Sequence, residues 1–366
     1  MESMPEECLR FEDQGWRQQN QREADANLLT LRISPGITLW RQMEMARELT
    51  FIEAVREGFR QAMRRDERVI ILGEDVKVSI FGTTKFLWDE FGDQRIIDTP
   101  ICESAFVGAA VGAAMTGMRP IVEIMFAEYL YLAMDQIATQ AASWHYITGG
   151  QLKIPLVVEV LYGTRGSGAY SHSQSLEASF LNPPGLKIVC PSTPYDAKGL
   201  VKSAIDDDNP VLFFEHRKIL AMKGEVPEEE YSIPIGEAKI WRDGKDVTIL
   251  GTSWTTHQSV KAAQMLGREG IEAEVVDLRT LKPLDKKTIF NSIQKTSRLV
   301  IVEEGRKTGG YGAEIAAMVA EEHIEYLDAP IRRVAAIDTP VPFSPPLEER
   351  YLPNESKIVE AVKSIL

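Results

Sequence analysis

The chain is poor in cysteine and has no long apolar run. Its three cysteines, Cys8, Cys102 and Cys190, are scattered over 366 residues. Their spacing and odd number argue against a disulfide framework and favour a reducing compartment. No apolar run approaches the roughly 20 residues that a membrane-spanning helix requires. From these absences we expect a cytoplasmic protein that does not cross a membrane.

The chain also lacks an excess of basic residues. It has 41 Lys and Arg residues against 54 Asp and Glu residues, which gives a formal net charge of -13. Nucleic acids and anionic membranes are bound through basic patches, so we expect neither as a partner. An acidic chain is still compatible with a basic protein partner. The five histidines and three cysteines form no cluster with metal-ligand spacing, so the sequence predicts no transition-metal site.

The first 45 residues are polar and carry charges of both signs. They contain no apolar core of a signal peptide, and their acids argue against a mitochondrial transit peptide, which is acid-poor. We expect a partly disordered extension over 1–45. Only the segment "LLTLRI" within it has the apolar character to lie against the protein surface.

From residue 46 onwards, apolar β-rich runs alternate with helical patterns. Apolar residues at helical spacing predict a helix over 49–67, and a buried strand follows over 68–76. "RPIVEIMF" (119–126) predicts another strand, and 128–150 predicts a long helix that ends at two glycines. Alternation of this kind predicts a mostly parallel sheet with helices on both faces.

A charged stretch with proline and glycine, residues 221–236, interrupts the alternation and predicts a linker. The expected fold class is therefore α/β, with two three-layer α/β/α domains over 46–220 and 237–366. The stretch "RDGKD" (242–246), near the start of the second domain, is expected to form a hairpin turn.

Glu103 is the only acid in "ICESAFVGAAVGAAMTGMRP" (101–120), a segment of mostly small and apolar residues. One interpretation is local: an acid stabilises the first turn of a helix through its dipole, with Thr99 as the cap and Pro100 at the first helical position. The other is functional: a carboxyl group in a dry cleft has a raised pKa and can share a proton with a heterocyclic nitrogen. The residues alone leave both open.

Two further stretches carry candidate chemistry. His172 lies in the Gly- and Ser-rich stretch "GSGAYSHSQ" (166–174), and a loop histidine can titrate near neutral pH. The serines beside it lack a nucleophile-elbow motif, which disfavours a serine hydrolase. "GGYGAEIAA" (309–317) lacks the full spacing of a dinucleotide-binding turn, so a nucleotide-dependent oxidoreductase ranks last. His257 is expected to cap a helix or to face an interface.

Several long motifs occur together and in one order: "LGEDV", "RIIDTPICESAFVGAAVGAAMTGMRPIVEIMF", "DQIATQAA", "HSQSLEASF", "PGLKIVCPSTPYDAKGLVKSAIDDDNPVLFFEH" and "KTGGYGAEIAAMV". Over about 46–366 the chain thereby resembles the beta subunits of the thiamine-diphosphate-dependent, decarboxylating component of 2-oxo acid dehydrogenase complexes. That group includes the pyruvate, branched-chain 2-oxo acid and acetoin dehydrogenases. The resemblance implies a transketolase-like pyrimidine-binding domain followed by a transketolase-type C-terminal domain.

The resemblance also implies roles for individual residues. The glutamate at the position of Glu103 hydrogen-bonds the aminopyrimidine ring of the cofactor and promotes the tautomer that removes the thiazolium proton. Tyr129 and Met125 match positions that line the pyrimidine pocket. His172 matches a histidine near the thiazolium that steadies the intermediate or assists acyl transfer. Glu74 matches an acid implicated in proton communication between paired active sites.

Expectations about partners and ions follow from the same resemblance. The Gly-Asp-Gly motif with a downstream Asn, which serves the magnesium ion and the pyrophosphate, does not occur here, and in this family a separate alpha subunit supplies it. We therefore expect an alpha2-beta2 heterotetramer that docks on a lipoyl acyltransferase core, with a beta chain that is inactive alone. Some members hold a structural potassium ion through backbone carbonyls, which match Leu156, Ala204, Ile205, Asp207 and Asn209.

Three departures from the family pattern leave the 2-oxo acid and the acyl acceptor open. Cys102 stands where serine is common, Glu159 stands where many members carry arginine after the strand, and "AYSHSQ" replaces the commoner "AAQHSQ". All three are expected near the substrate side.

The leading prediction is oxidative decarboxylation of a 2-oxo acid, or acetoin cleavage, with acyl transfer to lipoyl groups. In an alternative function, the same thiamine chemistry delivers the two-carbon or acyl unit to a carrier protein in specialised metabolism. The third candidate function is that of a non-catalytic scaffolding subunit. The joint presence of Glu103, Tyr129 and His172 disfavours it.

Overall fold

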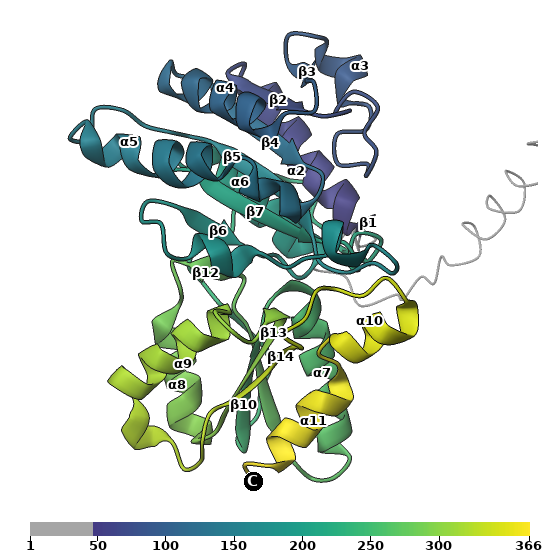
Figure 1. The fold of residues 1–366 in the computed structure, drawn as a ribbon, viewed down its shortest axis with the longest axis vertical. Helices are drawn as coiled ribbons and strands as arrows, with labels where there is room; N and C mark the ends of the chain where they lie inside the picture. Colours follow the sequence, from purple (N-terminus) through teal and green to yellow (C-terminus); the bar gives the residue numbers. More distant parts are fainter. Residues whose placement is uncertain (1–46) are drawn as a thin grey trace, which may run out of the picture. The chain divides into compact units, whose positions relative to one another are not determined.

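The computed structural model describes residues 47–366, and the extension predicted over 1–45 lies outside the described residues. The described part contains two α/β sheets with their helices, coloured purple to teal and green to yellow in Figure 1. The expected α/β class with mostly parallel sheets is confirmed. Within residues 47–366, no helix combines the length and apolar character needed to cross a membrane.

The first sheet has seven strands in the order β12-β6-β7-β5-β4-β2-β3. Neighbouring strands are parallel, except that the edge strand β12 pairs with β6 in antiparallel orientation. Because helices cover both faces, the strands are continuous apolar runs, and every residue of "VIILG" in β2 is buried. The strands are β2 (Val69–Gly73), β3 (Ile96–Asp98), β4 (Arg119–Ile124), β5 (Val157–Tyr162), β6 (Lys187–Val189), β7 (Val211–His216) and β12 (Thr280–Lys282).

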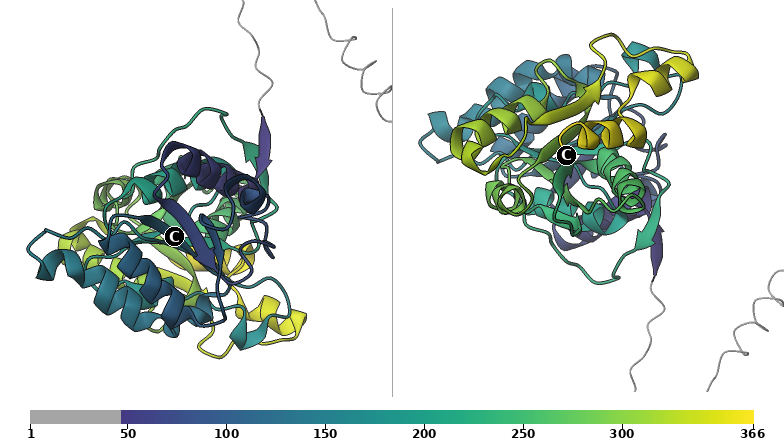
Figure 2. Two further views of the ribbon diagram at one scale, coloured as in Figure 1. Left: turned by 90° about the horizontal axis from the view of Figure 1, so that it is seen from above. Right: turned by 90° about the horizontal axis from the view of Figure 1, so that it is seen from below.

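Helices cover the two faces of this sheet with separate apolar cores. On one face α2 (Phe51–Arg65) packs against α6 (Pro194–Asp206), and a capping box of Thr50 and Glu53 begins α2. On the other face lie α4 (Glu103–Met115) and the helical segment that follows β4. Figure 2 shows the two helical layers on opposite sides of the strands. The short helix α3 (Leu87–Phe91) precedes β3.

The long helix predicted over 128–150 is helical but divided. It consists of a 3-10 turn η3 (Ala127–Tyr131), a π-helical stretch η4 (Asp135–Ala141) and α5 (Ala142–Ile147). π-helical stretches often lie at functional sites. The division places η3 directly after β4, at the carboxyl end of the sheet. Short 3-10 turns η5 (Ala169–Ser171) and η6 (Glu177–Phe180) follow β5.

The second sheet has five strands in the order β14-β13-β10-β11-β9, all parallel except β9. Helices α7 and α11 pack together on one face, while α8 and α9 contact β10 and β13. The elements are β9 (Lys239–Arg242), β10 (Val247–Gly251), α7 (Ser253–Gly267), β11 (Ala273–Asp277), α8 (Lys286–Thr296), β13 (Leu299–Arg306), α9 (Tyr311–Glu322), η7 (Ile324–Tyr326), β14 (Arg332–Ala336), α10 (Pro345–Tyr351) and α11 (Glu355–Lys363).

The hairpin turn predicted over 242–246 is wrong. β9 pairs with β11, and β11 separates it from β10 in the sheet order. The turn residues do reverse the chain, but the strand that follows them is not the neighbour of β9. Local turn chemistry predicts a change of direction, whereas the pairing partner is decided by the whole sheet.

Residues 221–236, which the sequence predicts as a linker, run along the first domain. Their strand β8 (Lys223–Glu225) pairs with β1 (Glu48–Thr50), just before α2. The buried Nζ of Lys198 on α6 donates to the carbonyls of Pro227, Glu228 and Glu229 at 2.5, 3.1 and 2.8 Å. Both contacts fix the segment to the helices of the first domain.

Candidate active site

Glu103 begins α4 at the carboxyl edge of the first sheet. Cys102 is the N-cap, so the expected start at Pro100 with Thr99 as the cap is wrong. The reason is that the N–H of Thr99 still donates to the carbonyl of Gly73 at 2.9 Å, which keeps this residue tied to the strand end. Glu103 is 4 % exposed, and no group within residues 47–366 hydrogen-bonds its carboxylate.

Glu74 follows β2 and reaches the same edge. It is buried, and its Oε1 atom has no hydrogen-bond partner in the described part of the chain. Burial, and next the charges of Glu103 and Asp75, raise the pKa of Glu74. The two predicted acids are therefore close enough for the charge of Glu103 to act on Glu74.

Aromatic rings pack around His172. The ring of Phe126 meets it edge-on with 4.3 Å between centroids, and Phe126 meets Tyr129 in the same way at 5.9 Å. The Tyr129 hydroxyl lies 3.4 Å from Nε2 of His172, and the Ser171 hydroxyl lies 2.8 Å from Nδ1. Both ring nitrogens therefore have a hydroxyl neighbour.

Tyr129 connects this aromatic cluster to the acids. Burial, followed by the charges of Glu128, Glu103 and Glu74, raises the pKa of its hydroxyl. Met125 is half-buried and comes directly after β4, at the start of the same turn. Glu74, Glu103, Tyr129 and His172, which are distant in sequence, thus share one edge of the sheet.

Two residues that sequence reasoning missed hold the backbone beside His172. Oε1 of Glu128 accepts the N–H groups of Ser173 and Gln174, both at 2.6 Å. The guanidinium of Arg217, directly after β7, donates to the carbonyl of His172. Their only signal in the sequence is adjacency: Glu128 precedes Tyr129, and Arg217 follows an apolar strand.

The cluster fits a flat nitrogen heterocycle such as an aminopyrimidine. Glu103 offers a carboxyl group that has no hydrogen-bond partner among residues 47–366, and Phe126 and Tyr129 offer aromatic surface. The buried, unpaired oxygen of Glu74 requires a polar partner, because buried polar atoms are nearly always hydrogen-bonded. Ile101, two residues before Glu103, is 81 % exposed, so this edge presents apolar surface to the outside.

Three other buried glutamates lie away from this cluster, on adjacent strands of the first sheet. Burial raises the pKa of Glu123 to about 7 and that of Glu215 to about 8. Burial, followed by the charges of these two neighbours, raises the pKa of Glu159 well above its usual value. Glu159 lies within β5 and is fully buried, so the expectation that it follows the strand is wrong, whereas its place relative to the substrate stays a prediction.

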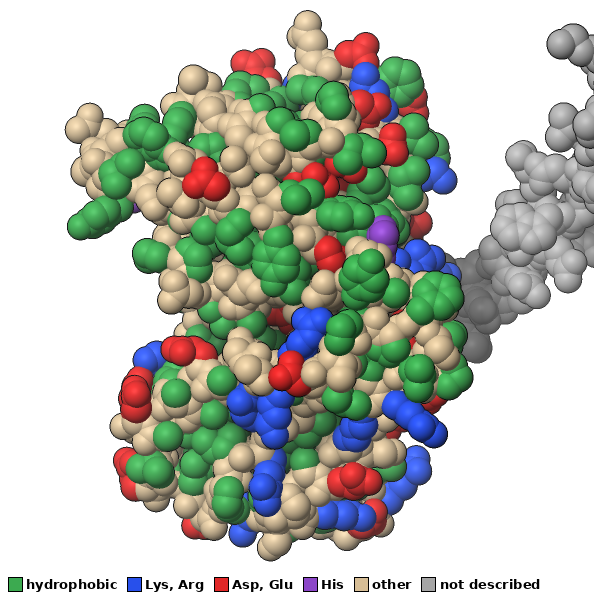
Figure 3. All heavy atoms as spheres, in the orientation of Figure 1, with side chains coloured by type: hydrophobic (Ala, Val, Ile, Leu, Met, Phe, Trp, Pro, Cys, Tyr) green, Lys and Arg blue, Asp and Glu red, His purple; other side chains and the backbone are tan. Residues whose placement is uncertain are grey.

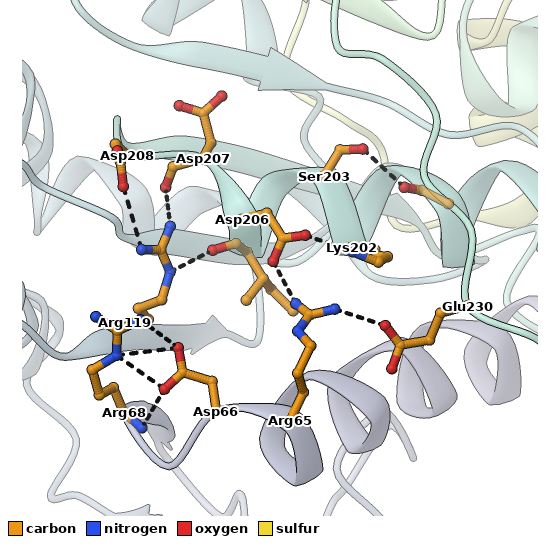
Figure 4. A network of polar contacts seen from close by, with 12 residues as sticks. Arg65, Asp66, Arg68, Arg119, Lys202, Ser203, Asp206, Asp207, Asp208 and Glu230 are labelled. Carbon is orange, nitrogen blue, oxygen red and sulfur yellow. Dashed lines mark hydrogen bonds and ion pairs between the residues drawn. The ribbon is translucent and has the colours of Figure 1, made fainter.

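The carbonyls expected to hold potassium lie around the end of α6, and Figure 4 shows a guanidinium among them. Arg119 donates to the carbonyls of Ile205 and Asp207, both at 2.9 Å. The carbonyl of Leu156 accepts the N–H of Val211 at 2.8 Å. Arg119 thus places positive charge on two of the five expected positions, and potassium binding there stays a prediction.

In the glycine-rich turn at 309–317, a buried carboxylate already accepts a backbone N–H. The carboxylate of Glu303 accepts the N–H of Gly312 at 3.1 Å, at the N-terminus of α9. His257 contacts the carbonyl of Ser192 at 2.7 Å and so faces the first domain, one of its two predicted roles. Within residues 47–366, no three His, Cys, Asp or Glu side chains are grouped to hold a metal ion.

Comparison with known proteins identifies the domains that carry this site. Residues 47–223 match the transketolase pyrimidine binding domain, and residues 236–358 match the transketolase C-terminal domain. Among solved structures, a split gene transketolase described as an inactive beta4 tetramer superposes with a TM-score of 0.71 at 25% identity, over 87% of this chain and 98% of that chain.

Curated relatives are more similar still. The beta subunit of the acetoin:2,6-dichlorophenolindophenol oxidoreductase of Bacillus subtilis is 45% identical over 336 residues, which are 88% of this chain and 98% of that protein. The beta subunit of the pyruvate dehydrogenase E1 component of Gracilaria tenuistipitata var. liui is 46% identical over 321 residues, 87% of this chain and 99% of that protein. The chain therefore belongs to the transketolase-like family of dehydrogenase beta subunits, as its motifs predict.

Proposed function

We propose that this chain is the catalytic beta subunit of a thiamine-diphosphate-dependent 2-oxo acid or acetoin dehydrogenase. In this role it takes part in the oxidative decarboxylation of a pyruvate-like 2-oxo acid, or in acetoin cleavage, with transfer of the acyl unit to lipoyl groups. The observation that carries the proposal is Glu103, a buried carboxyl at the start of α4 that has no hydrogen-bond partner among residues 47–366 and interacts with Glu74.

The side chains divide the work around the cofactor. When bound, thiamine diphosphate supplies the electron sink for carbon–carbon cleavage. Glu103 holds a proton at a pyrimidine ring nitrogen, and burial in a site of low dielectric keeps that hydrogen bond strong. Tyr129 and Met125 pack on the ring. Glu74 exchanges protons with Glu103, and its raised pKa allows it to stay protonated nearer to neutral pH than an exposed glutamate.

His172 is the group on this chain best placed to serve acyl transfer. Its ring lies between the hydroxyls of Tyr129 and Ser171, and it is not fully buried. A histidine can donate or accept a proton near neutral pH, which the attack of a thiol on an acyl group requires. Its loop also joins the carboxyl end of β5 to the rest of the first sheet.

An alpha subunit completes the site in this proposal. The chain has no Gly-Asp-Gly motif for the pyrophosphate and its magnesium ion. Apolar side chains are exposed at the carboxyl edge of the first sheet, where Glu103 lies. They include Val78, which is 70 % exposed, and Ile101, which is 81 % exposed. Figure 3 shows hydrophobic side chains spread over the upper domain on this face, whereas Lys and Arg gather over the lower one. We propose an alpha2-beta2 assembly that covers this apolar surface.

Replacement of Glu103 by Gln tests the catalytic assignment. Because Gln keeps the shape but cannot supply a carboxyl proton, we expect turnover to fall by at least about a hundredfold, a typical loss for general acid–base groups. The beta chain is coexpressed with its alpha subunit, and decarboxylation is measured with pyruvate, branched-chain 2-oxo acids and acetoin. Size-exclusion chromatography and cofactor titration establish that the assembly is intact.

Glu314→Gln is the matched control, since Glu314 is an exposed acid in the first turn of α9. It loses the same charge next to a helix N-terminus without touching the site. Unchanged turnover in Glu103→Gln would overturn the assignment. Equal losses of turnover in both variants would show that the charge at a helix N-terminus, and not contact with the cofactor, explains the role of Glu103.

A further inference from the structure

The loop that carries His172 is attached at both ends to a strand of the second domain. It spans residues 163–175, between β5 and η6. The strand is β13, whose residues Glu304 and Arg306 reach the first and last parts of the loop. These attachments lie outside the set of residues assigned above to the cofactor.

Glu304 holds the beginning of the loop through both oxygens of its carboxylate. Oε1 accepts the N–H of Thr164 at 2.7 Å, and Oε2 lies 2.6 Å from Nε2 of His216 at the end of β7. Nδ1 of His216 accepts the N–H of Lys218 at 3.1 Å, so the proton of a neutral imidazole resides on Nε2 and is donated to Glu304. Both side chains of the pair are almost completely buried, at 1% and 3% exposure.

The surroundings of His216 leave one position for the ring. Trp254 of α7 stacks on it with 5.6 Å between centroids, and Tyr162 meets it edge-on at 4.9 Å. Gly163 packs directly against it, since a Cβ atom on that glycine would lie 2.3 Å from Nε2. The position of the His216 ring therefore fixes the position of Gly163, where the loop begins.

The same connection continues to the carbonyl of His172. Arg217, the residue after His216, donates to that carbonyl, and its guanidinium lies 5.2 Å from the centre of the Phe126 ring. Its own N–H donates to the carbonyl of Tyr162 at 3.0 Å. Displacement of His216 would thus move the group that holds the backbone of His172.

Arg306 holds the far end of the loop. Its Nη1 donates to Oε1 of Gln174 at 3.0 Å, and its Nε donates to the carbonyl of Thr339 at 3.1 Å. The backbone of Gln174 closes the loop, because its carbonyl accepts the N–H of Gly163 at 3.1 Å. Both ends of the loop are thereby linked to one strand of the second domain.

We propose that Glu304 and Arg306 of β13 are positioning residues that clamp the His172 loop from the second domain, with His216 as the link between them and the active site. The clamp rests on the proposed function for its catalytic meaning, since its purpose is to hold His172 against Tyr129 during turnover. It explains why a buried carboxylate is kept here: its two oxygens accept from Thr164 and His216 and fix a geometry that an apolar side chain of similar size would leave free.

Glu304→Gln tests the first half of the clamp. The amide has one oxygen to accept from two donors, Thr164 and His216, and its NH2 group meets a donor. Arg306→Met tests the second half at a partly exposed position, where loss of the charge leaves the core intact. Glu272→Gln is the matched control, because its exposed pair with Lys245 lies in the same domain away from the loop.

Hydrogen exchange of the 163–175 peptide is measured in the intact complex with the alpha subunit, together with the rate of tryptic cleavage after Arg165, which is exposed. We expect exchange and cleavage to rise by about tenfold or more in both variants, the size expected for loss of a charge-assisted hydrogen bond. The control should match the unmodified protein. Unchanged exchange in both variants would overturn the clamp.

Steady-state kinetics separate positioning from a purely structural role. Because Glu304 and Arg306 act only through the position of His172, we expect kcat to fall about tenfold while KM for the 2-oxo acid stays within about twofold. Faster exchange with unchanged kcat would overturn the positioning role. If the unmodified complex shows no turnover with any substrate, the proposed function fails, and the exchange measurement still decides whether the clamp holds the loop.

Discussion

At the scale of single residues, the least expected feature is the row of buried glutamates in the first sheet. Glu123 and Glu159 are register partners on β4 and β5, and Glu215 lies on the next strand. Both oxygens of Glu159 and of Glu215 lack hydrogen-bond partners among the described residues. A buried carboxylate is costly without a partner, so these groups are stable in the protonated form.

Glu159→Gln should therefore make the protein more stable at alkaline pH. A folded-state pKa above the unfolded value means that the folded chain retains a proton which the unfolded chain releases. The stability from this group is fully present below about pH 4.5 and declines as pH rises toward the folded pKa, by about 1.4 kcal/mol per pH unit. Gln cannot ionise and removes that decline.

The measurement is the thermal midpoint of the coexpressed complex at pH 5 and pH 8.5, at one protein concentration. We expect Glu159→Gln to raise the midpoint at pH 8.5 and to change it little at pH 5. A mutation of the exposed Glu269, which pairs with Lys363 on the surface, controls for net charge. A shift of equal size at both pH values would contradict a protonated Glu159.

The site residues that could be predicted from the sequence lie within local motifs, whereas those that could not be predicted depend on contacts between distant segments. Glu103, Tyr129 and His172 lie within contiguous motifs, so a resemblance to a family points to each of them. Glu304 and His216 meet across 88 residues of sequence, and neither has a local signal. Pairing between two domains is decided by how their sheets pack, which no pattern of spacing describes.

At the scale of elements, residues 221–236 show how one side chain can fix a whole segment. Nζ of Lys198 lies between three carbonyls of this segment and the carboxylate of Glu57, which it approaches at 2.8 Å. The lysine side chain is 1% exposed, so each of these contacts is protected from water. Tyr195 and Tyr231 stack beside it, with 4.6 Å between ring centroids.

Lys198→Met is expected to release this segment. The three carbonyls lose a buried donor, while Arg47 still neutralises Glu57, so we expect a loss of about 2–3 kcal/mol. Hydrogen exchange of the 226–234 peptide should rise clearly in the intact complex, together with a lower thermal midpoint. Lys202→Met is the control on the same helix, since its i,i+4 pair with Asp206 is at the surface. Equal effects of the two variants would contradict the anchoring role.

The parallel strands and most helices are predictable because apolar periodicity is a local property. The central strands, such as β5 and β7, are long apolar runs that only a sheet buried on both faces requires. The edges are less predictable. β9 and β12 are short antiparallel strands whose partners are distant, and the turn over 242–246 gave no indication that β9 would pair with β11.

At the scale of the whole molecule, the proposed function assigns to this chain one half of a site shared with an alpha subunit. Acids and aromatic rings for the pyrimidine are present, whereas the motif for a metal-bound pyrophosphate is not in the sequence. Large apolar side chains are exposed on the first domain, including Tyr146 at 87 % and Ile147 at 60 %. Exposed apolar surface of this kind marks a binding partner.

The chain alone is therefore expected to show no thiamine-diphosphate-dependent turnover. Purified beta chain, alpha chain and their coexpressed complex are compared with the same 2-oxo acid, cofactor and magnesium concentrations. We expect activity only in the complex, and calorimetry should detect tight cofactor binding only there. Turnover by the isolated beta chain would contradict a site shared between subunits.

The strand β12 has a consequence for how separable the two domains are. It comes from the region that matches the C-terminal domain, yet it completes the sheet of the first domain by pairing with β6. A fragment that ends at residue 223 would leave the backbone groups of β6 unpaired along an open edge, which is a site for aggregation. The halves are consequently not interchangeable modules: a functional chimera between relatives would have to inherit residues 280–282 together with the pyrimidine-binding domain.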